Sequence, residues 1–396
     1  MPWEETNPEM ERMKFILDLE TGREPMAELC RRYGISRQTG YVWKHRFEEG
    51  GAAALADRPS SAHTHGNAID AEVADQIVSL RKAHPTWGPK KLRAILRGQL
   101  QPGRVLPATS TIGEVLKRRG MIAPRRRRIR TPPLKSTLSD YTGPNAIWCI
   151  DHKGHFALDG QTRCYPLTLL DGFSRYLFKL EALPSTSEEQ AMPHIERAFR
   201  EFGLPVRIRS DGGPPFAACG VPARLSRLSI WWVKLGIRLE RIDPGHPEQN
   251  GRLERFHKTL EEAIPTTPRT MSEQQRLFDG FRGEYNQVRP HEALGQCPPA
   301  SVYETSWRSY PTTVGSPEYP NDFSVRRVRS NGCLAWKGHE IFVSTLLVGE
   351  PLFFTDVGDE QWEMWFGTVF LATVTLRGPK PQLSYERAAV AAGTPH

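Results

Sequence analysis

Hydrophobic residues recur at helical spacing in the first fifty residues and predict three helices. A Pro at position 25 suits the first turn of a helix, here over residues 26–33. Ser36 can cap a helix over 37–47, because its side-chain oxygen accepts a free backbone N–H. The apolar positions of the first helix are Met13, Ile16 and Leu17.

The third of these helices is polar and basic and follows a turn that contains glycine. This arrangement is typical of a helix-turn-helix unit, here residues 1–50, whose second helix enters the major groove of DNA. An ordinary helical hairpin is the alternative, and both readings stay open. Residues 51–68 are small and polar and predict a linker. The side chains that could contact DNA are Arg37, Gln38, Lys44 and Arg46.

A second helical block covers residues 69–122 and is interpreted as a second helix-turn-helix unit. Its first helix has one apolar face and ends before Pro85. A short basic helix is expected over 90–97, and Thr109-Ser110-Thr111 are expected to cap a third helix. The apolar face of the first helix consists of Ile69, Val73, Ile77 and Leu80.

A basic stretch joins this block to the rest of the chain, over residues 123–139. No acid lies between Val115 and Ser139. Such a run is either a solvated linker or an arm that follows DNA phosphates and releases their counterions. Two DNA-reading units upstream favour the arm. Its candidate DNA-binding residues are Arg125, Arg126, Arg127, Arg128 and Arg130.

The pattern of apolar and polar residues changes twice more along the chain. Over residues 140–305, short β-branched apolar runs alternate with helical ones, which predicts a mixed α/β sheet with helices on its faces. Over 316–380, short strand-like runs are separated by Gly and Asp turns, which predicts a small all-β barrel. The fold class is therefore multidomain, with all-α, α/β and all-β parts in that order.

Composition fits an intracellular DNA-binding protein. The net charge is +8, which favours a polyanionic partner. The six cysteines are scattered without a C-x-x-C pair, so reduced thiols in the cytoplasm are expected and neither a zinc module nor a disulfide framework is. No signal peptide and no apolar run of 18 residues is found, so no membrane-spanning helix is expected.

Three acids stand where elements begin or end. Asp151 follows the apolar run 146–150, and Asp211 follows the strand expected over 206–210. Glu254 lies in the first turn of a helix that Asn250 can cap. An acid at the end of a buried strand is costly to desolvate unless a cation balances it. Taken singly, each acid could also cap a turn or face solvent.

Together the three acids suit Mg²⁺, with Mn²⁺ as a substitute, because hard cations prefer oxygen ligands. Two ions about 3.5–4 Å apart can activate an attacking oxygen and stabilise a leaving one. Residues three, four and seven places after Glu254 share its helix face: His257, Lys258 and Glu261. Lys258 either holds a phosphate there or is a solvated lysine. Other acids considered for the third position are Glu248, Glu261 and Glu262.

Six motifs in order carry a resemblance to a known family. They are WCID (148–151), DGFSRY (171–176), FGLP (202–205), SDGG (210–213), PGHPEQNGRLERFHKTL (244–260) and YNQVRPHEAL (285–294). The block they span resembles the catalytic core of retroviral-integrase-like DDE transposases, which implies a ribonuclease-H-like fold. The upstream helical units and the β-rich tail resemble the layout of bacterial insertion-sequence enzymes. The missing His/Cys zinc module separates the chain from retroviral integrases.

The resemblance implies a site, a reaction and partners. Asp151, Asp211 and Glu254 would be the catalytic residues and would hold two Mg²⁺ ions. The reaction would be phosphodiester hydrolysis at the ends of the element, followed by transfer of the 3′-hydroxyl into target DNA. The partners would be double-stranded DNA, as terminal inverted repeats and target, and further copies of the chain in a homodimer or larger assembly. His257 and Lys258 would contact DNA.

Some residues of these motifs stay open, and two features depart from the family pattern. Asp171 is interpreted as a turn former, and for Asn286, Arg289 and His291 fastening of the last helix is favoured over DNA contact. Gly212 stands where the family often has Asn, and the spacing from Asp211 to Glu254 is longer than usual, with the extra residues expected in 214–227. The rival functions are a DNA-binding regulator derived from a transposase and a plain nuclease.

Overall fold

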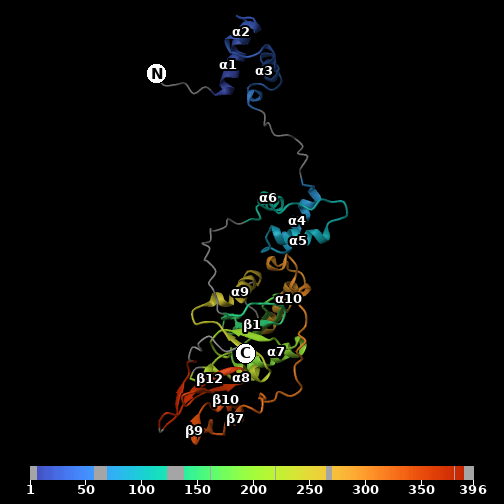
Figure 1. Ribbon diagram of the computed structural model, residues 1–396. Helices are drawn as coiled ribbons and strands as arrows, with labels where there is room; N and C mark the ends of the chain where they lie inside the picture. Colours follow the sequence, from blue (N-terminus) through green and yellow to red (C-terminus); the bar gives the residue numbers. More distant parts are fainter. Residues whose placement is uncertain are drawn as a thin grey trace. The chain divides into compact units, whose positions relative to one another are not determined.

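The structure is a computed structural model that describes residues 7–57, 69–122, 138–160, 162–218, 220–264, 270–378 and 380–387 (Figure 1). It divides into two units, Met1–Ile69 and Asp70–His396. The predicted basic arm, Arg125 to Arg128 and Arg130, lies outside the described residues. No helix in the described ranges is both long and apolar enough to cross a membrane.

The first unit contains the three predicted helices, α1 (Pro8–Glu20), α2 (Met26–Arg32) and α3 (Arg37–Gly50), and a 3₁₀ turn, η1 (Ala52–Leu55). Ser36 caps α3 as predicted, because its Oγ accepts a hydrogen bond from the Thr39 backbone N–H at 3.1 Å. Helices α2 and α3 approach closely at Gly40, where a Cβ would lie 2.6 Å from Cys30 Sγ. The small core consists of Phe15, Ile16, Leu29, Cys30 and Leu55.

The second helical block contains α4 (Ala71–Ala83), α5 (Pro89–Gln99) and α6 (Thr109–Arg118). The prediction that Thr109-Ser110-Thr111 would cap the third helix was wrong. The residue at the N-cap of α6 is Ala108, which makes no side-chain cap bond, and the three hydroxyl residues lie inside the first turn. The helix begins at Thr109, one turn before the fully buried Ile112. The first turn is therefore already helical at the three residues that were expected to cap it.

A six-stranded mixed sheet forms the centre of the α/β part. Its strands are β1 (Ile147–His152), β2 (Phe156–Ala157), β3 (Arg163–Asp171), β4 (Leu177–Leu183), β5 (Arg207–Ser210) and β6 (Arg238–Arg241). The order is β2-β3-β1-β5-β6, and β4 also pairs with β3. Strand β1 is antiparallel to β3 but parallel to β5, and β5 is parallel to β6. Strand β1, which contains Asp151, and strand β5, which precedes Asp211, are therefore neighbours that run in the same direction.

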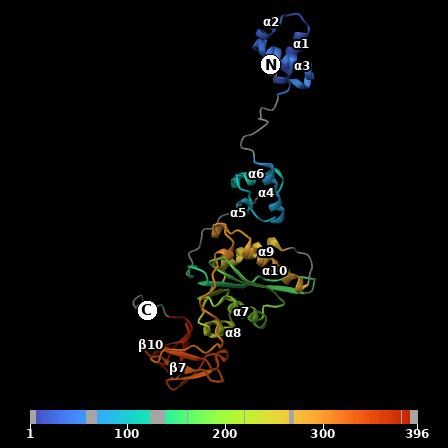
Figure 2. The ribbon, with the colours of Figure 1, turned by 90° about the vertical axis from the view of Figure 1, so that its right-hand side faces the viewer.

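Helices cover both faces of this sheet, as Figure 2 shows. The helices α7 (Glu188–Phe202) and α8 (Arg227–Lys234) lie on one face, and α9 (Gly251–Ala263) and α10 (Met271–Gln287) on the other. Side chains alternate along β1: Trp148 and Ile150 pack with α7 and α8, whereas Cys149 packs with α9 and α10. By the same alternation Asp151 points to the α9 side. Four 3₁₀ turns complete this part: η2 (Pro222–Arg224), η3 (Pro247–Asn250), η4 (Glu292–Leu294) and η5 (Pro299–Ser301).

The C-terminal part is all-β, which confirms that feature of the predicted fold class. Its elements are β7 (Ser324–Arg327), β8 (Cys333–Trp336), β9 (His339–Phe342), η6 (Thr345–Leu347), β10 (Pro351–Gly358), β11 (Gln361–Phe366), β12 (Val369–Thr375) and β13 (Gln382–Ser384). Five strands form a sheet in the order β13-β12-β11-β10-β7, and β8 pairs with β9. The core of this part includes Ile230 and Val233 of α8, so α8 is buried on two sides.

Candidate active site

The first acid, Asp151, lies near the end of β1 and faces the layer of α9. In the antiparallel pair of β1 and β3 it lies opposite Thr168, which is fully buried. The Thr168 hydroxyl lies 3.2 Å from Nε2 of His257 on α9. The sheet thus brings Asp151 to the part of α9 that carries His257.

The second acid, Asp211, begins the turn after β5. The backbone N–H of Gly213 donates a hydrogen bond to its carboxylate. Its Oδ1 is buried and has no hydrogen-bond partner among the described residues. The guanidinium of Arg224 donates to the carbonyl of Gly212, and a Cβ at Gly212 would lie 3.1 Å from Arg224 Nη1. Glycine after Asp211 therefore leaves room for Arg224, which comes from the longer segment that the sequence placed in 214–227.

The third acid, Glu254, lies in the first turn of α9 and is exposed. The prediction that the Asn250 side chain caps this helix was wrong. Asn250 occupies the N-cap position without a side-chain cap bond, and its buried Oδ1 has no partner among the described residues. The 3₁₀ turn η3 already ends at Asn250, at φ −109° and ψ 27°, so its side chain does not start from the extended backbone of a capping residue.

The charges of Asp211 and Glu254 act on the carboxyl group of Asp151. The pKa of Asp151 is raised to about 7, chiefly by burial and in addition by the charges of Asp211 and Glu254, against a backbone hydrogen bond from His152. Burial also raises the pKa of Asp211. Within the described ranges no three His, Cys, Asp or Glu side chains lie close enough to hold one ion. The buried, unpartnered Asp211 oxygen and the mutual repulsion of the acids nevertheless fit a hard divalent cation, which would offset both.

Lys153 is a residue at the edge of this site that the sequence analysis missed. Its Nζ lies 2.8 Å from Oε1 of Glu261, so Glu261 is held by a lysine. The pKa of His257 is lowered to about 4, chiefly by burial and in addition by the charge of Lys153. The signal was present, because Lys153 lies two residues after Asp151 and alternation puts both on one face of the strand. Lys258, the predicted phosphate-binding residue, is half-buried on α9.

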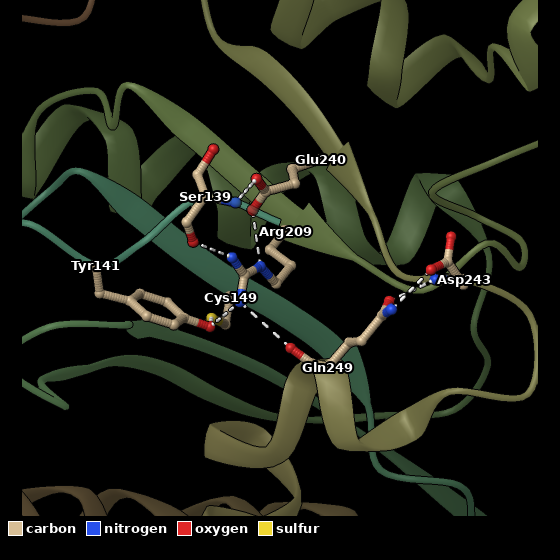
Figure 3. A network of polar contacts seen from close by, with 7 residues as sticks. All are labelled: Ser139, Tyr141, Cys149, Arg209, Glu240, Asp243 and Gln249. Carbon is tan, nitrogen blue, oxygen red and sulfur yellow. Dashed lines mark hydrogen bonds and ion pairs between the residues drawn. The ribbon is translucent and has the colours of Figure 1, made fainter. Parts of the chain in front are cut away.

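A buried network around Arg209 connects the segments that carry Asp211 and Glu254 (Figure 3). Arg209, on β5, is 4% exposed, and its Nε donates to Oε2 of Glu240 on β6 at 2.7 Å. Its guanidinium also donates to the carbonyls of Ser139, at 2.7 Å, and Gln249, at 3.2 Å, and to the Tyr141 hydroxyl. Arg209 therefore links the strand before Asp211 to the turn before α9.

The turn before α9 is itself held by side-chain hydrogen bonds. The Gln249 side chain accepts from the backbone N–H of Asp243 and donates to its carboxylate, both at 2.7 Å. With Arg209 on the Gln249 carbonyl, the path from β6 to α9 is fixed at both ends. We assign Arg209 a positioning role, since it acts on Glu254 through the backbone. Arg209 is one of two arginines in β5, and nothing near it in the sequence indicated this role.

The predicted DNA-binding side chains of α3 differ in their surroundings. Arg37 and Gln38 are exposed at its N-terminal end. Lys44 forms a long ion pair with Glu48, at 3.7 Å. Arg46 donates to the carbonyl of Ala56 at 2.8 Å and lies over the Trp43 ring, so it is held within its own unit.

Two motif residues have the structural roles that the sequence favoured. Asp171 is fully buried, and its carboxylate accepts hydrogen bonds from the Ser174 backbone and hydroxyl and from the Asn145 backbone. Asn286 accepts from the backbone N–H of Leu177 and donates to its carbonyl. Asp171 thus forms a turn, and Asn286 fastens α10 to β4.

Models of known families match most of the described elements. Two models of the integrase core domain match residues 141–247 and 235–299. A helix-turn-helix domain model matches 11–63, and a homeodomain-like domain model matches 39–116. Asp151 and Asp211 lie within the first integrase-core match and Glu254 within the second.

Similar proteins include uncharacterized products of bacterial insertion elements. The 39.2 kDa protein of IS476 from Xanthomonas euvesicatoria is 28% identical over 231 residues, which are 57% of this chain and 62% of that protein. The 31.7 kDa protein of IS407 from Burkholderia multivorans is 28% identical over 189 residues, 47% of this chain and 65% of that protein. Each match spans less than two thirds of the relative. The integrase catalytic core of HTLV-2, solved with magnesium, is 16% identical, and its match covers 41% of this chain and 99% of that one with a TM-score of 0.32.

Proposed function

We propose a reaction from one premise: the chain belongs to the integrase superfamily, with the transposases of bacterial insertion elements. In this proposal it hydrolyses phosphodiesters at the ends of its own element and transfers the freed 3′-hydroxyl into target DNA. The observation that supports the proposal most is the group of three acids inside the integrase-core match. Asp151 lies in β1 and Asp211 follows the neighbouring parallel strand β5, and Asp211 keeps a buried oxygen without a partner in the described chain.

In the proposed site Asp151, Asp211 and Glu254 hold two divalent ions, Mg²⁺ or Mn²⁺ in its place. Bound there, the ions would activate the attacking oxygen and stabilise the leaving one. Strands β1 and β5 fix the two aspartates, and the Arg209 network fixes the start of the helix that carries Glu254. His257, neutral at physiological pH because burial lowers its pKa to about 4, can exchange a hydrogen bond without adding charge. Lys258 is proposed to hold a phosphate of the bound DNA.

The helical units are proposed to recognise the terminal inverted repeats of the element. Helix α3 presents exposed Arg37 and Gln38 at its N-terminal end, the part of a recognition helix that contacts base edges. Two ends must be held at once for transposition, so a homodimer or larger assembly on DNA is part of the proposal.

Metal removal tests the reaction. Mg²⁺ or Mn²⁺ is expected to support cleavage of a duplex that carries the element's end, and EDTA is expected to abolish it. Binding of that duplex in a gel-shift assay should survive EDTA, because the recognition units lie outside the site. Zinc should be absent from protein purified without added metal, since no Cys and His ligand group of suitable spacing exists in the described ranges. Cleavage that persists in EDTA, with metal removal verified by elemental analysis, would disprove the proposed chemistry.

DNA recognition is tested by two sets of substitutions in the full chain. Arg37→Ala with Gln38→Ala should reduce the preference for terminal over random duplex, because base contacts specify sequence. Replacing the four arginines Arg125, Arg126, Arg127 and Arg128 by alanine should weaken binding to both duplexes alike. If all four arginines contact phosphates, the slope of log affinity against log salt should fall by about 3–4. Equal binding of the wild-type chain to terminal and random duplexes in competition would contradict sequence-specific recognition.

A further inference from the structure

A strongly basic pocket lies in the α/β core beside the N-terminal half of α9. Its lining includes residues of α9, the turn after β3, the end of α10 and η4, with Glu292 as the acid among them. The four arginines that line it are Arg175, Arg252, Arg255 and Arg289. Nothing in the proposed reaction uses them. The pocket therefore concentrates positive charge in one place without a matching number of acids.

Arg289 is the most unusual of these residues. It is 7% exposed, yet its guanidinium has neither a hydrogen bond nor an ion pair with any described residue, and Glu262 and Glu284 affect it only through their charge. Arg209 is as deeply buried but has four partners. His291 also lines the pocket, and its Nε2 is buried without a partner among the described residues. The Arg289 nitrogens are not fully enclosed, and the side chain lines the pocket, so an anion bound there would supply the acceptor that the described chain does not.

Two further arginines are held in the pocket by the turn after β3. Arg175 and Arg252 both donate to the carbonyl of Gly172, and Arg252 lies over the Tyr141 ring at 3.3 Å. The pKa of Arg252 is lowered to about 10, chiefly by burial and in addition by the charge of Arg175. These guanidinium groups are thus kept together against their repulsion, which an anion would relieve.

We infer that this pocket binds a phosphate of the DNA backbone other than the one that is cut. Guanidinium groups bind phosphate oxygens with paired hydrogen bonds, and Arg289 lines the pocket without an acceptor among the described residues. Arg255 follows Glu254 on α9 but lies with Arg252 and Thr259 on a neighbouring face of the helix, so the pocket would take a different phosphate from the one at Glu254. The sequence favoured a fastening role for Arg289 and His291, but the structure shows that role at Asn286. The inference rests on the proposed function, because DNA supplies the phosphate.

Salt-dependent DNA binding of the full chain in EDTA tests this inference. Arg289→Gln and Arg255→Gln are compared with the wild type and with Arg276→Gln, an exposed arginine of α10 outside the pocket. Each pocket substitution should weaken binding of the terminal duplex three- to tenfold. The slope of log affinity against log salt should fall by about one for each phosphate that the variant no longer neutralises. Arg255→Lys should restore much of the affinity, and Arg276→Gln should change neither quantity.

Arg255 is exposed, so Arg255→Gln remains decisive if Arg289→Gln fails to fold. Wild-type affinity and slope in folded Arg255→Gln would overturn the inference. Inorganic phosphate can also be added during thermal unfolding. If it raises the melting temperature of the pocket variants as much as that of the wild type, and the variants bind DNA with wild-type affinity, the pocket is not a phosphate site. A wild type that shows no metal-dependent cleavage, but whose DNA binding depends on Arg255 and Arg289, would instead contradict the proposed reaction and leave the pocket assignment standing.

Discussion

Asp151→Asn, Asp211→Asn and Glu254→Gln are each expected to lower the rate of DNA cleavage by about 100-fold or more. Each change keeps the shape of the side chain and removes one negative charge from the proposed metal site. Metal ions supply several kcal/mol of stabilisation to charge that develops at phosphoryl oxygens, and each 1.4 kcal/mol lost is about tenfold in rate. The measurement is single-turnover cleavage and strand transfer on a duplex that carries the element's end.

The three changes should act as a unit. A double variant such as Asp151→Asn with Asp211→Asn should be scarcely slower than either single one, because ligands of a common metal site do not contribute additively. Glu261→Gln is the matched control on α9, since Glu261 pairs with Lys153 at 2.8 Å. It should cost far less than Glu254→Gln. The reverse order of the two effects would mean that Glu254 is not the third ligand, and a wild type inactive with both metals would favour the DNA-binding regulator.

Replacing Arg209 by Met is expected to destabilise the core by about 3–5 kcal/mol, because it leaves Glu240 buried and without its ionic partner. The Glu240 side chain is 11% exposed, and Arg209 is its ion-pair partner at 2.7 Å. The change also removes the hydrogen bonds to the carbonyls of Ser139 and Gln249. Thermal and urea unfolding of the full chain would measure the change in stability.

A double substitution separates the ion pair from the rest of the network. Arg209→Met with Glu240→Leu removes both charges and should be less destabilising than Arg209→Met alone, since no carboxylate is left unpaired. The double variant should still cleave DNA more slowly than the wild type, because the Gln249 carbonyl and the start of α9 remain unheld. A destabilisation of under about 1 kcal/mol in Arg209→Met would show that the network does not hold this part of the fold.

Local patterns in the sequence predicted the elements and the order of the acids, and they failed where partners lie far apart in the chain. Asp151 follows an apolar run and Asp211 a short strand-like run, each visible within six residues. Arg209 depends on Glu240 and Ser139, which are 31 and 70 residues away, so no local pattern shows the network. The two predicted caps that were wrong, at Thr109 and Asn250, are residues of a type that often caps a helix. They lack the backbone conformation or position of a capping residue, because the neighbouring turns determine where the helix begins.

The longer segment between Asp211 and Glu254 shows the same limit. The spacing from Asp211 to Glu254 is longer than is usual in the family, and the extra residues were expected in 214–227. In the structure Arg224 lies beside Gly212, and the next residue, Leu225, is fully buried in the core of the C-terminal part. The segment therefore connects two parts of the molecule. Its role depends on the sheet that follows about 100 residues later, which its own residues do not reveal.

Helix α8 has a consequence for where one functional part ends and another begins. Its Leu228 and Trp232 belong to the core under the catalytic sheet, whereas Ile230 and Val233 belong to the core of the C-terminal part. A chain that ended near residue 315 would keep all three acids and expose the second side of α8 to water as an apolar surface. The smallest piece expected to keep the proposed activity without exposing this surface therefore includes strands that carry none of the proposed catalytic residues.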